Sequence, residues 1–147
     1  TMSNQLSELD IKSLDYLKID TQGAELEILK GIGNFRPLLI KIEAHFFSMY
    51  KNVPDWNKLV NYLGDLNYAL IDWKEIGGHN TRVPVEADMI FIPNFNNETG
   101  KNLIKDNAEK FISLMLIFGQ IKLLQILMKR FEIDNKEIEN LEDNYFN

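Results

Sequence analysis

The residues of this sequence that could do chemistry lie at the ends of two short apolar segments. Asp20 ends segment 16–20 (YLKID), and Glu43 and His45 end segment 38–45 (LLIKIEAH). Carboxylates bind cations or orient an imidazole, and an imidazole titrates near neutral pH, so the three residues could supply an acid, a base or a ligand. If the two segments are neighbouring parallel strands, their carboxyl ends share the sheet edge where α/β proteins bind ligands.

A structural interpretation of the same charges is equally open. Lys18 and Asp20 share one face of their predicted strand, as do Lys41 and Glu43, so these charges could simply pair across adjacent strands. His45 by itself is more often a structural or surface histidine than a catalyst.

Aromatic residues follow His45 closely in the sequence: Phe46, Phe47, Tyr50 and Trp56. Such side chains could line a substrate pocket, although core packing explains aromatic residues more often. We predict Tyr50 and Trp56 as the substrate-binding members of this group.

The elements that would position these residues alternate between strand and helix. Apolar runs predict strands over 16–20, 38–43, 68–73 and 88–93. Apolar residues at helical spacing predict two helices, over residues 23–30 and 56–66. The first ends at Lys30 and is followed by Gly31, a typical C-terminal cap. Residues 75–85, which contain Gly77, Gly78 and Pro84, are predicted as a loop or hairpin connection. This alternation indicates an α/β sheet that is parallel at first.

The C-terminal part begins after a polar break at residues 94–100. Residues 101–131 are predicted to form one long helix or two, and the acidic tail 132–147 is predicted to be partly disordered. Stretch 111–128 is strongly apolar but contains Ser, Gly, Gln and Lys residues, which suit the centre of a bilayer poorly. We therefore predict a buried or partner-facing helix and no transmembrane segment.

Apolar residues of this C-terminal part recur with the spacing of a helix-pairing seam. Gln120, Asp134 and Gly119 interrupt the pattern, so the seam is expected to pack mainly through residues 111–131, either back on the sheet or against a second chain. We favour the second chain, and hence a homo-oligomer, because symmetric dimers are the commonest solution for an exposed apolar face. The seam consists of Ile117, Leu124, Phe131, Ile138 and Tyr145, with Leu127 and Leu141 between them.

Composition limits the class of protein. The 147 residues are 45% hydrophobic and 26% charged, as in ordinary globular proteins. A net charge of −6 argues against a nucleic-acid partner. The absence of cysteine excludes disulfides, thiolate metal ligands and cysteine nucleophiles and is compatible with the cytoplasm, which is the predicted location. No signal peptide is recognisable at residues 1–9. We predict no metal site.

The segment that contains Asp20 also carries a family resemblance. Residues 15–31, DYLKIDTQGAELEILKG, resemble the signature segment of FkbM-type methyltransferases, which use S-adenosylmethionine. Segments 42–45 (IEAH), 66–70 (LNYAL) and 88–92 (DMIFI) resemble the later strands of that family. The resemblance covers about residues 9–93.

This resemblance implies a partial Rossmann-like methyltransferase sheet, made of the later strands, parallel and then one antiparallel, with a C-terminal helical segment. It implies methyl transfer to a hydroxyl of a sugar or polyketide-like small molecule. Asp20 and His45 would raise the nucleophilicity of that hydroxyl, and Glu43 would orient His45 or bind a substrate hydroxyl.

The sequence departs from this family at the cofactor site. Methyltransferases of this fold bind their cofactor mainly through a first strand, its glycine-rich turn and a later acidic residue, and no such segment precedes Tyr16. Gly31 and Gly33 follow a predicted helix and are typical of a C-terminal cap. We therefore expect residues 1–100 to be the C-terminal half of a methyltransferase domain, residues 101–131 a helical extension, and the isolated chain to be inactive.

Two alternative functions are considered in addition to methyl transfer. One is a non-catalytic truncated module that acts through helix-mediated oligomerisation. The other, a hydrolase that uses Asp20 and His45, lacks a convincing nucleophile, because neither Ser48 nor Thr21 lies in a nucleophile-elbow motif.

Overall fold

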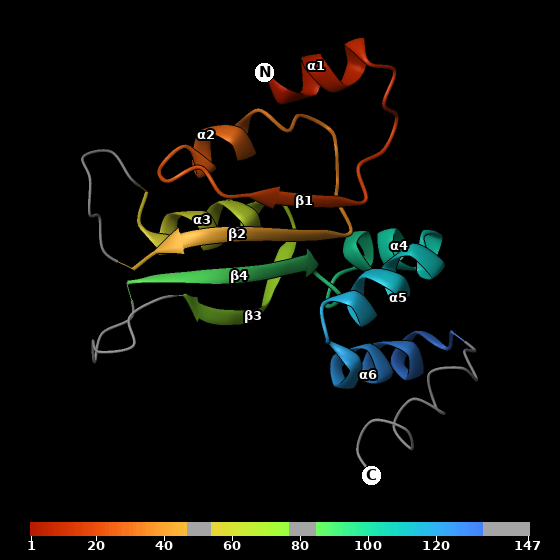
Figure 1. Cartoon of the computed structure of the whole chain (residues 1–147). Helices are drawn as coiled ribbons and strands as arrows, with labels where there is room; N and C mark the ends of the chain where they lie inside the picture. Colours follow the sequence, from red (N-terminus) through yellow and green to blue (C-terminus); the bar gives the residue numbers. More distant parts are fainter. Residues whose placement is uncertain (47–53, 77–84, 134–147) are drawn as a thin grey trace.

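A computed structural model describes residues 1–46, 54–76 and 85–133 of the chain (Figure 1). The element order is α1 (Met2–Glu8), β1 (Tyr16–Ile19), α2 (Glu25–Lys30), β2 (Leu39–His45), α3 (Trp56–Asp65), β3 (Tyr68–Ile76), β4 (Glu86–Pro93), α4 (Glu98–Asp106), α5 (Ala108–Ile117) and α6 (Ile121–Phe131). The α/β alternation and the helical C-terminal part are thus confirmed. Residues 101–131 were predicted as one or two helices, but they belong to three, because the helix is also interrupted at Asn107. Helix α1 was not predicted.

The four strands form one mixed sheet in the order β1-β2-β4-β3. Strands β1 and β2 are parallel, with Ile19 opposite Ile42, whereas β4 is antiparallel to both of its neighbours. Strand β3 therefore runs in the direction of β1 and β2, and β4 is the one strand that runs against them. The predicted change from parallel to antiparallel pairing is confirmed.

Helices α2 and α3 cover one face of this sheet (Figure 1). Alternate residues of the strands point to this face, so apolar side chains such as Ile40 and Ile42 of β2 pack with Leu29 of α2 and Leu59 of α3. The predicted helices 23–30 and 56–66 agree with α2 and α3 to within two residues at either end. These two helices fix the strands whose carboxyl ends carry Asp20 and Glu43.

The opposite face is covered over only part of its length. Helices α4 to α6 pack where β2 begins and β4 ends, and their side chains share a core with Leu39, Ile90 and Ile92. Further along β2, the residues on this face are Lys41, Glu43 and His45, and none of them belongs to that core. The helical cover therefore ends at the point where the strands change from apolar to charged residues.

The C-terminal helices differ from the predicted partner-facing seam. The helix breaks between α5 and α6 at Gly119, whose φ of +69° is the left-handed conformation that glycine adopts readily. Leu124, Leu127 and Phe131 are buried against the sheet of their own chain, whereas Ile117 is 75% exposed. Our preference for a second chain as the cover of the three buried residues was wrong, because the exposed sheet face offers them a nearer apolar surface.

The other predictions for the C-terminal part have different outcomes. Ile138, Leu141, Tyr145 and the predicted tail lie mostly or wholly outside the described residues. A homo-oligomer stays a prediction. Among the residues that the structure describes, no helix combines the length and apolar character that a membrane span requires.

Candidate functional site

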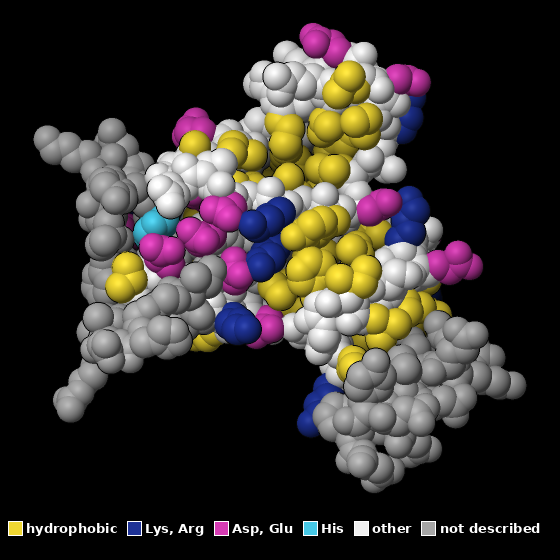
Figure 2. Space-filling view, in the orientation of Figure 1, with side chains coloured by type: hydrophobic (Ala, Val, Ile, Leu, Met, Phe, Trp, Pro, Cys, Tyr) yellow, Lys and Arg dark blue, Asp and Glu magenta, His cyan; other side chains and the backbone are white. Residues whose placement is uncertain are grey.

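Charged side chains gather on the uncovered part of the sheet (Figure 2). On this face the register places Lys18 of β1 beside Lys41 of β2, Glu43 beside Asp88 of β4, and His45 beside Glu86. The apolar surface to one side of this group marks the helix-covered region in Figure 2. Because these residues occupy alternate positions on paired strands, their side chains all leave the same face of the sheet.

The predicted trio Asp20, Glu43 and His45 comes from the carboxyl ends of adjacent parallel strands, as expected. Asp20 directly follows β1 and is partly exposed, with 39% of its side chain accessible. Its carboxylate pairs with Lys18 at 2.8 Å, within the same strand face. Asp20 also lies near enough to Glu43 to raise the pKa of that carboxyl. The predicted proximity of these strand ends is thus present, and part of the predicted charge pairing is present with it.

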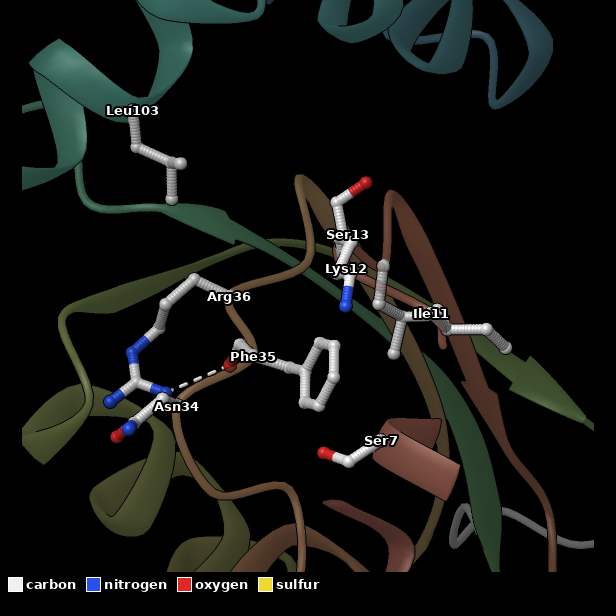
Figure 3. A pocket seen from close by; sticks show the side chains of 9 residues that line it. Ser7, Ile11, Lys12, Ser13, Asn34, Phe35, Arg36 and Leu103 are labelled. Atoms are coloured by element: carbon white, nitrogen blue, oxygen red, sulfur yellow. Dashed lines mark hydrogen bonds between the residues drawn. The ribbon is translucent and has the colours of Figure 1, made fainter. Parts of the chain in front are cut away.

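A cavity of about 470 Å³ lies elsewhere in the molecule (Figure 3). Its lining comes from α1, from the segments that precede β1 and β2, and from α4, so it lies at the amino ends of the parallel strands. The guanidinium of Arg36 donates from Nη1 to the carbonyl oxygens of Gly33 and Phe35, both at 2.8 Å. Lys12 forms an ion pair with Asp10. The cations at this cavity are therefore engaged locally, at the end of the sheet opposite to Asp20.

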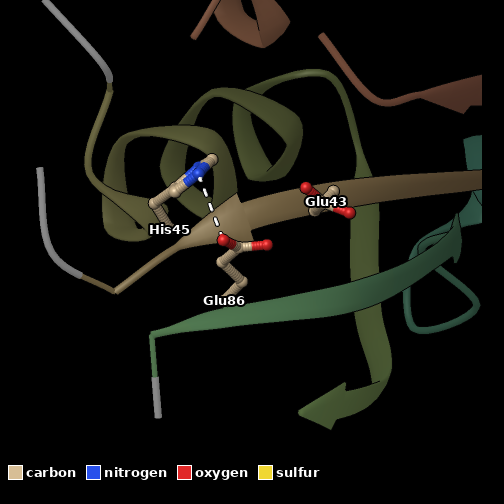
Figure 4. Close-up of side chains that lie close together, drawn as sticks. All are labelled: Glu43, His45 and Glu86. Atoms are coloured by element: carbon tan, nitrogen blue, oxygen red, sulfur yellow. Dashed lines mark ion pairs between the residues drawn. The ribbon is translucent and has the colours of Figure 1, made fainter. Parts of the chain in front are cut away.

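Glu43, His45 and Glu86 form a cluster of three titratable residues on the charged face (Figure 4). One ligand atom from each residue lies within 4.8 Å of the other two. The His45 Nε2 atom is 4.0 Å from Glu86 Oε1, which is too long for a hydrogen bond. Glu86 is the member that sequence analysis missed, because the predicted strand began at Asp88 and left Glu86 outside it.

The buried state of His45 makes this cluster unusual. His45 is only 4% exposed, and its Nδ1 atom has no hydrogen-bond partner among the described residues. An unsatisfied buried polar group costs roughly 1–3 kcal/mol. Buried polar groups in folded proteins nearly always have partners, so this nitrogen calls for an explanation.

The two glutamates of the cluster lie close together, and neither forms an ion pair with a lysine or arginine in the described part of the chain. Burial raises the pKa of Glu43 above its usual value, and the negative charges of Asp20, Glu86 and Asp88 together with a side-chain hydrogen bond to Glu86 raise it further. Lys41, the nearest lysine along β2, pairs instead with Asp88. The cluster therefore favours a bound proton or cation over two free negative charges.

The predicted substrate-binding residue Trp56 does not lie on the charged face. Trp56 contacts Phe46 at a ring-centroid distance of 6.0 Å and Trp73 at 6.4 Å, forming an aromatic group with α3 on the helix-covered face. Phe46 and Trp56 both pack against the core on this helix-covered face, whereas His45 points to the other face. Trp56 is therefore not brought to the charged face. Tyr50, Phe47 and Ser48 lie outside the described residues.

The turn after β1 shows how the signature segment is built. Gln22 and Gly23 have positive φ angles of 52° and 130°, which wraps the chain around the side chain of Glu25. Glu25 is 1% exposed, and its Oε1 accepts hydrogen bonds from Thr21 N (3.3 Å), Thr21 Oγ1 (3.0 Å) and Gly23 N (2.9 Å). This turn therefore holds the end of β1, and with it Asp20, in a fixed place.

The same turn is poorly suited to bind a cofactor. Glycine-rich turns bind anionic or polar cofactor groups through free backbone N–H groups. Here the N–H groups of Thr21 and Gly23 already donate to Glu25, so the strand-to-helix turn after β1 does not fit S-adenosylmethionine.

An α/β sheet whose parallel strands end in a cluster of titratable residues is the architecture of enzymes that bind ligands at that edge. Comparison with known families makes the class specific: residues 3–70 match the model of the methyltransferase FkbM domain. The FkbM methyltransferase domain implies methyl transfer from S-adenosylmethionine. The match runs from α1 to the start of β3 and includes Asp20, Glu43 and His45, but not Glu86. No curated protein and no solved structure matches the chain.

Proposed function

We propose that a protein carrying this segment transfers a methyl group from S-adenosylmethionine to a hydroxyl of a sugar or polyketide-like small molecule. The observation that carries the proposal is the family match over residues 3–70, which includes β1 and Asp20 directly after it. The strand order β1-β2-β4-β3, with one antiparallel strand between two parallel ones, supports a partial Rossmann-like sheet.

Each site residue has a proposed role in that reaction. S-adenosylmethionine supplies an activated methyl group when it is bound. Asp20 is the exposed member of the site, so it can accept a hydrogen bond, and then the proton, from a substrate hydroxyl at the sheet edge. His45 lies beneath this edge as a second proton acceptor, and Glu43, between them, orients His45 or binds a substrate hydroxyl.

The cofactor site itself is proposed to come largely from outside the described residues. The turn after β1 is filled by Glu25, so we expect the 147-residue chain to bind S-adenosylmethionine very weakly. Titration calorimetry tests this expectation. A micromolar dissociation constant, equivalent to about 8 kcal/mol, would require a cofactor site within this chain and would contradict the proposal of a separate cofactor-binding part.

The catalytic roles are tested in a protein that joins this segment to a cofactor-binding part. Asp20→Asn and His45→Ala should each lower the rate of methyl transfer by ~10²–10⁴-fold, while changing the cofactor dissociation constant by a much smaller factor. The assay follows a radiolabelled methyl group from S-adenosylmethionine to a panel of hydroxyl acceptors.

Asp65→Asn is the matched control for these variants, because it removes a carboxylate at the end of α3, away from the charged face. It should retain the unmodified rate. Near-normal rates in both Asp20→Asn and His45→Ala would leave charge pairing as the better account of these residues.

Trp56 and Tyr50 stay proposed substrate-binding residues. The place of Trp56 on the helix-covered face means that a substrate contacting it would extend around the end of the sheet. A Trp56→Phe variant that leaves the Michaelis constant unchanged for every accepted substrate would remove it from the site.

A further inference from the structure

We infer that Glu43, His45 and Glu86 bind a divalent transition-metal ion. The inference goes beyond methyl transfer and is tested without the cofactor. It starts from the donor atoms, which are one imidazole nitrogen and two carboxylate oxygens from two paired strands. Mixed nitrogen and oxygen donors suit zinc and its neighbours, whereas Mg²⁺ and Ca²⁺ prefer oxygen donors alone.

The charges on this sheet face point to the same place. Five carboxylates extend from it in the described part of the chain. Asp20 pairs with Lys18 and Asp88 pairs with Lys41. Asp72 of β3 accepts a hydrogen bond from Gln120 at 2.7 Å. Glu43 and Glu86 instead contact each other and His45. Among the described residues, neither Glu43 nor Glu86 forms an ion pair with a lysine, so this part of the face would favour a bound cation.

The buried imidazole supplies an independent observation. His45 is directed toward Glu86 in Figure 4, and it is 96% removed from solvent without a hydrogen bond to Nδ1 from any described residue. A histidine that served only to fill the core would be expected to satisfy both ring nitrogens. A metal ion would use the lone pair of one nitrogen, and the resulting charge on the imidazole would strengthen the other nitrogen as a donor.

The geometry needs only side-chain adjustment to hold an ion. Bonds from zinc to nitrogen or oxygen ligands are about 2.0–2.2 Å long, so two ligand atoms of a tetrahedral site lie roughly 3.4 Å apart. The present separations reach up to 4.8 Å. Glu86 can close this difference by rotation, because its side chain is 33% exposed and lies at the start of β4.

A bound ion would also change the proposed roles in methyl transfer. Glu43 and His45 would act through the ion, which lowers the pKa of a coordinated hydroxyl. Asp20, which is not in the ligand set, would stay available to accept the proton. The proposal of metal binding and the proposal of methyl transfer can therefore be refuted independently, because metal binding is measured on this chain alone.

Titration calorimetry of the chelator-treated chain with zinc chloride at neutral pH is the test. We expect one ion per chain, with affinity lowered at least ~10–100-fold in Glu86→Gln and in His45→Ala. Asp88→Asn removes the same charge from the same strand without removing a ligand, and should bind zinc nearly as the unmodified chain does. Circular dichroism melting confirms that each variant is folded.

A second control addresses the other histidine of the chain, His79, which lies outside the described residues. His79→Ala should leave zinc binding unchanged. Absence of zinc binding to the folded chain, or binding that survives both Glu86→Gln and His45→Ala, would overturn the inference. Competition by an equal concentration of Mg²⁺ would overturn the assignment to a transition metal.

Discussion

Glu25 and His45 are the two buried polar residues in the part of the chain that the structure describes, and their surroundings differ. Both lie near the carboxyl edge of the sheet. Glu25 is surrounded by donors from its own turn and accepts three hydrogen bonds. His45 has an unpartnered Nδ1 and two glutamates beside it. The carboxylate of Glu25 is thus hydrogen-bonded within the signature segment, whereas His45 has a ring nitrogen that no described residue satisfies.

The largest expected effect is the loss of the Glu25 carboxylate. Glu25→Ala leaves the N–H groups of Thr21 and Gly23 without their acceptor, and hydrogen bonds to charged groups contribute roughly 1.5–3 kcal/mol each. Because such contributions are not additive, we expect the free energy of unfolding to fall by about 3 kcal/mol. Urea denaturation at neutral pH measures it.

Glu27→Ala is the control for that experiment. Glu27 lies on the same helix, is 72% exposed and pairs only with Lys30 at 2.7 Å. Its loss should cost less than about 1 kcal/mol. Equal losses of unfolding free energy in the Glu25 and Glu27 variants would contradict the role given to Glu25, because its carboxylate would then not stabilise the turn.

A smaller effect is expected at Tyr68, whose buried aromatic side chain carries a hydroxyl with one partner. Its hydroxyl donates to the carbonyl oxygen of Pro37 at 2.8 Å. Tyr68→Phe removes this hydrogen bond and should lower the free energy of unfolding by ~0.5–1.5 kcal/mol. Denaturation in urea at pH 7 again provides the measurement, and a neutral or stabilising result would show that the bond contributes nothing.

Burial also raises the pKa of Tyr68 well above its usual range. The unfolded chain releases this proton near pH 10, whereas the folded chain keeps it. The contribution of Tyr68 to stability is therefore complete below about pH 10 and is lost as the pH rises above that value. Stability curves of the unmodified chain and Tyr68→Phe should converge at alkaline pH. Parallel curves would contradict the pKa shift.

The smallest effect is expected at His45 when no metal is present. His45→Leu keeps a side chain of similar size and removes the unpartnered nitrogen, so in chelator it should change the free energy of unfolding by at most about 1 kcal/mol, in the stabilising direction. Urea denaturation in EDTA tests this. A loss of more than about 2 kcal/mol would mean that His45 is a satisfied structural residue, like Glu25.

Much of the sheet was predictable from the sequence because its apolar segments are short and bounded by polar residues. The strands at Tyr16 and Tyr68 and the helices at Glu25 and Trp56 start within two residues of the predicted positions. Helix α1 was missed because it buries no residue completely and therefore has no apolar stripe to recognise. The packing of Leu124 against its own sheet was not predicted, because periodicity shows which side of a helix is apolar but not which surface covers that side.

The site was predictable only in part, for a related reason. Asp20, Glu43 and His45 follow recognisable strands, and parallel pairing is enough to bring their ends together. Glu86 enters the cluster through antiparallel register, which places it opposite His45. That register depends on a strand that begins directly after the predicted loop 75–85, two residues before the predicted strand, so no local pattern could have linked the two residues.

The insertion of β4 between β2 and β3 has a consequence for the order of folding. The β3–β4 pair joins neighbouring segments and can form as a hairpin on a microsecond timescale, whereas the β2–β4 pair must bring together segments that are distant in the chain. Residues Glu43, His45 and Glu86 span this second pair, so their cluster is assembled late. An ion that joins them would act after the folding barrier. It should therefore slow unfolding and leave the folding rate nearly unchanged. The bound ion would then increase the kinetic stability of the β2–β4 pairing.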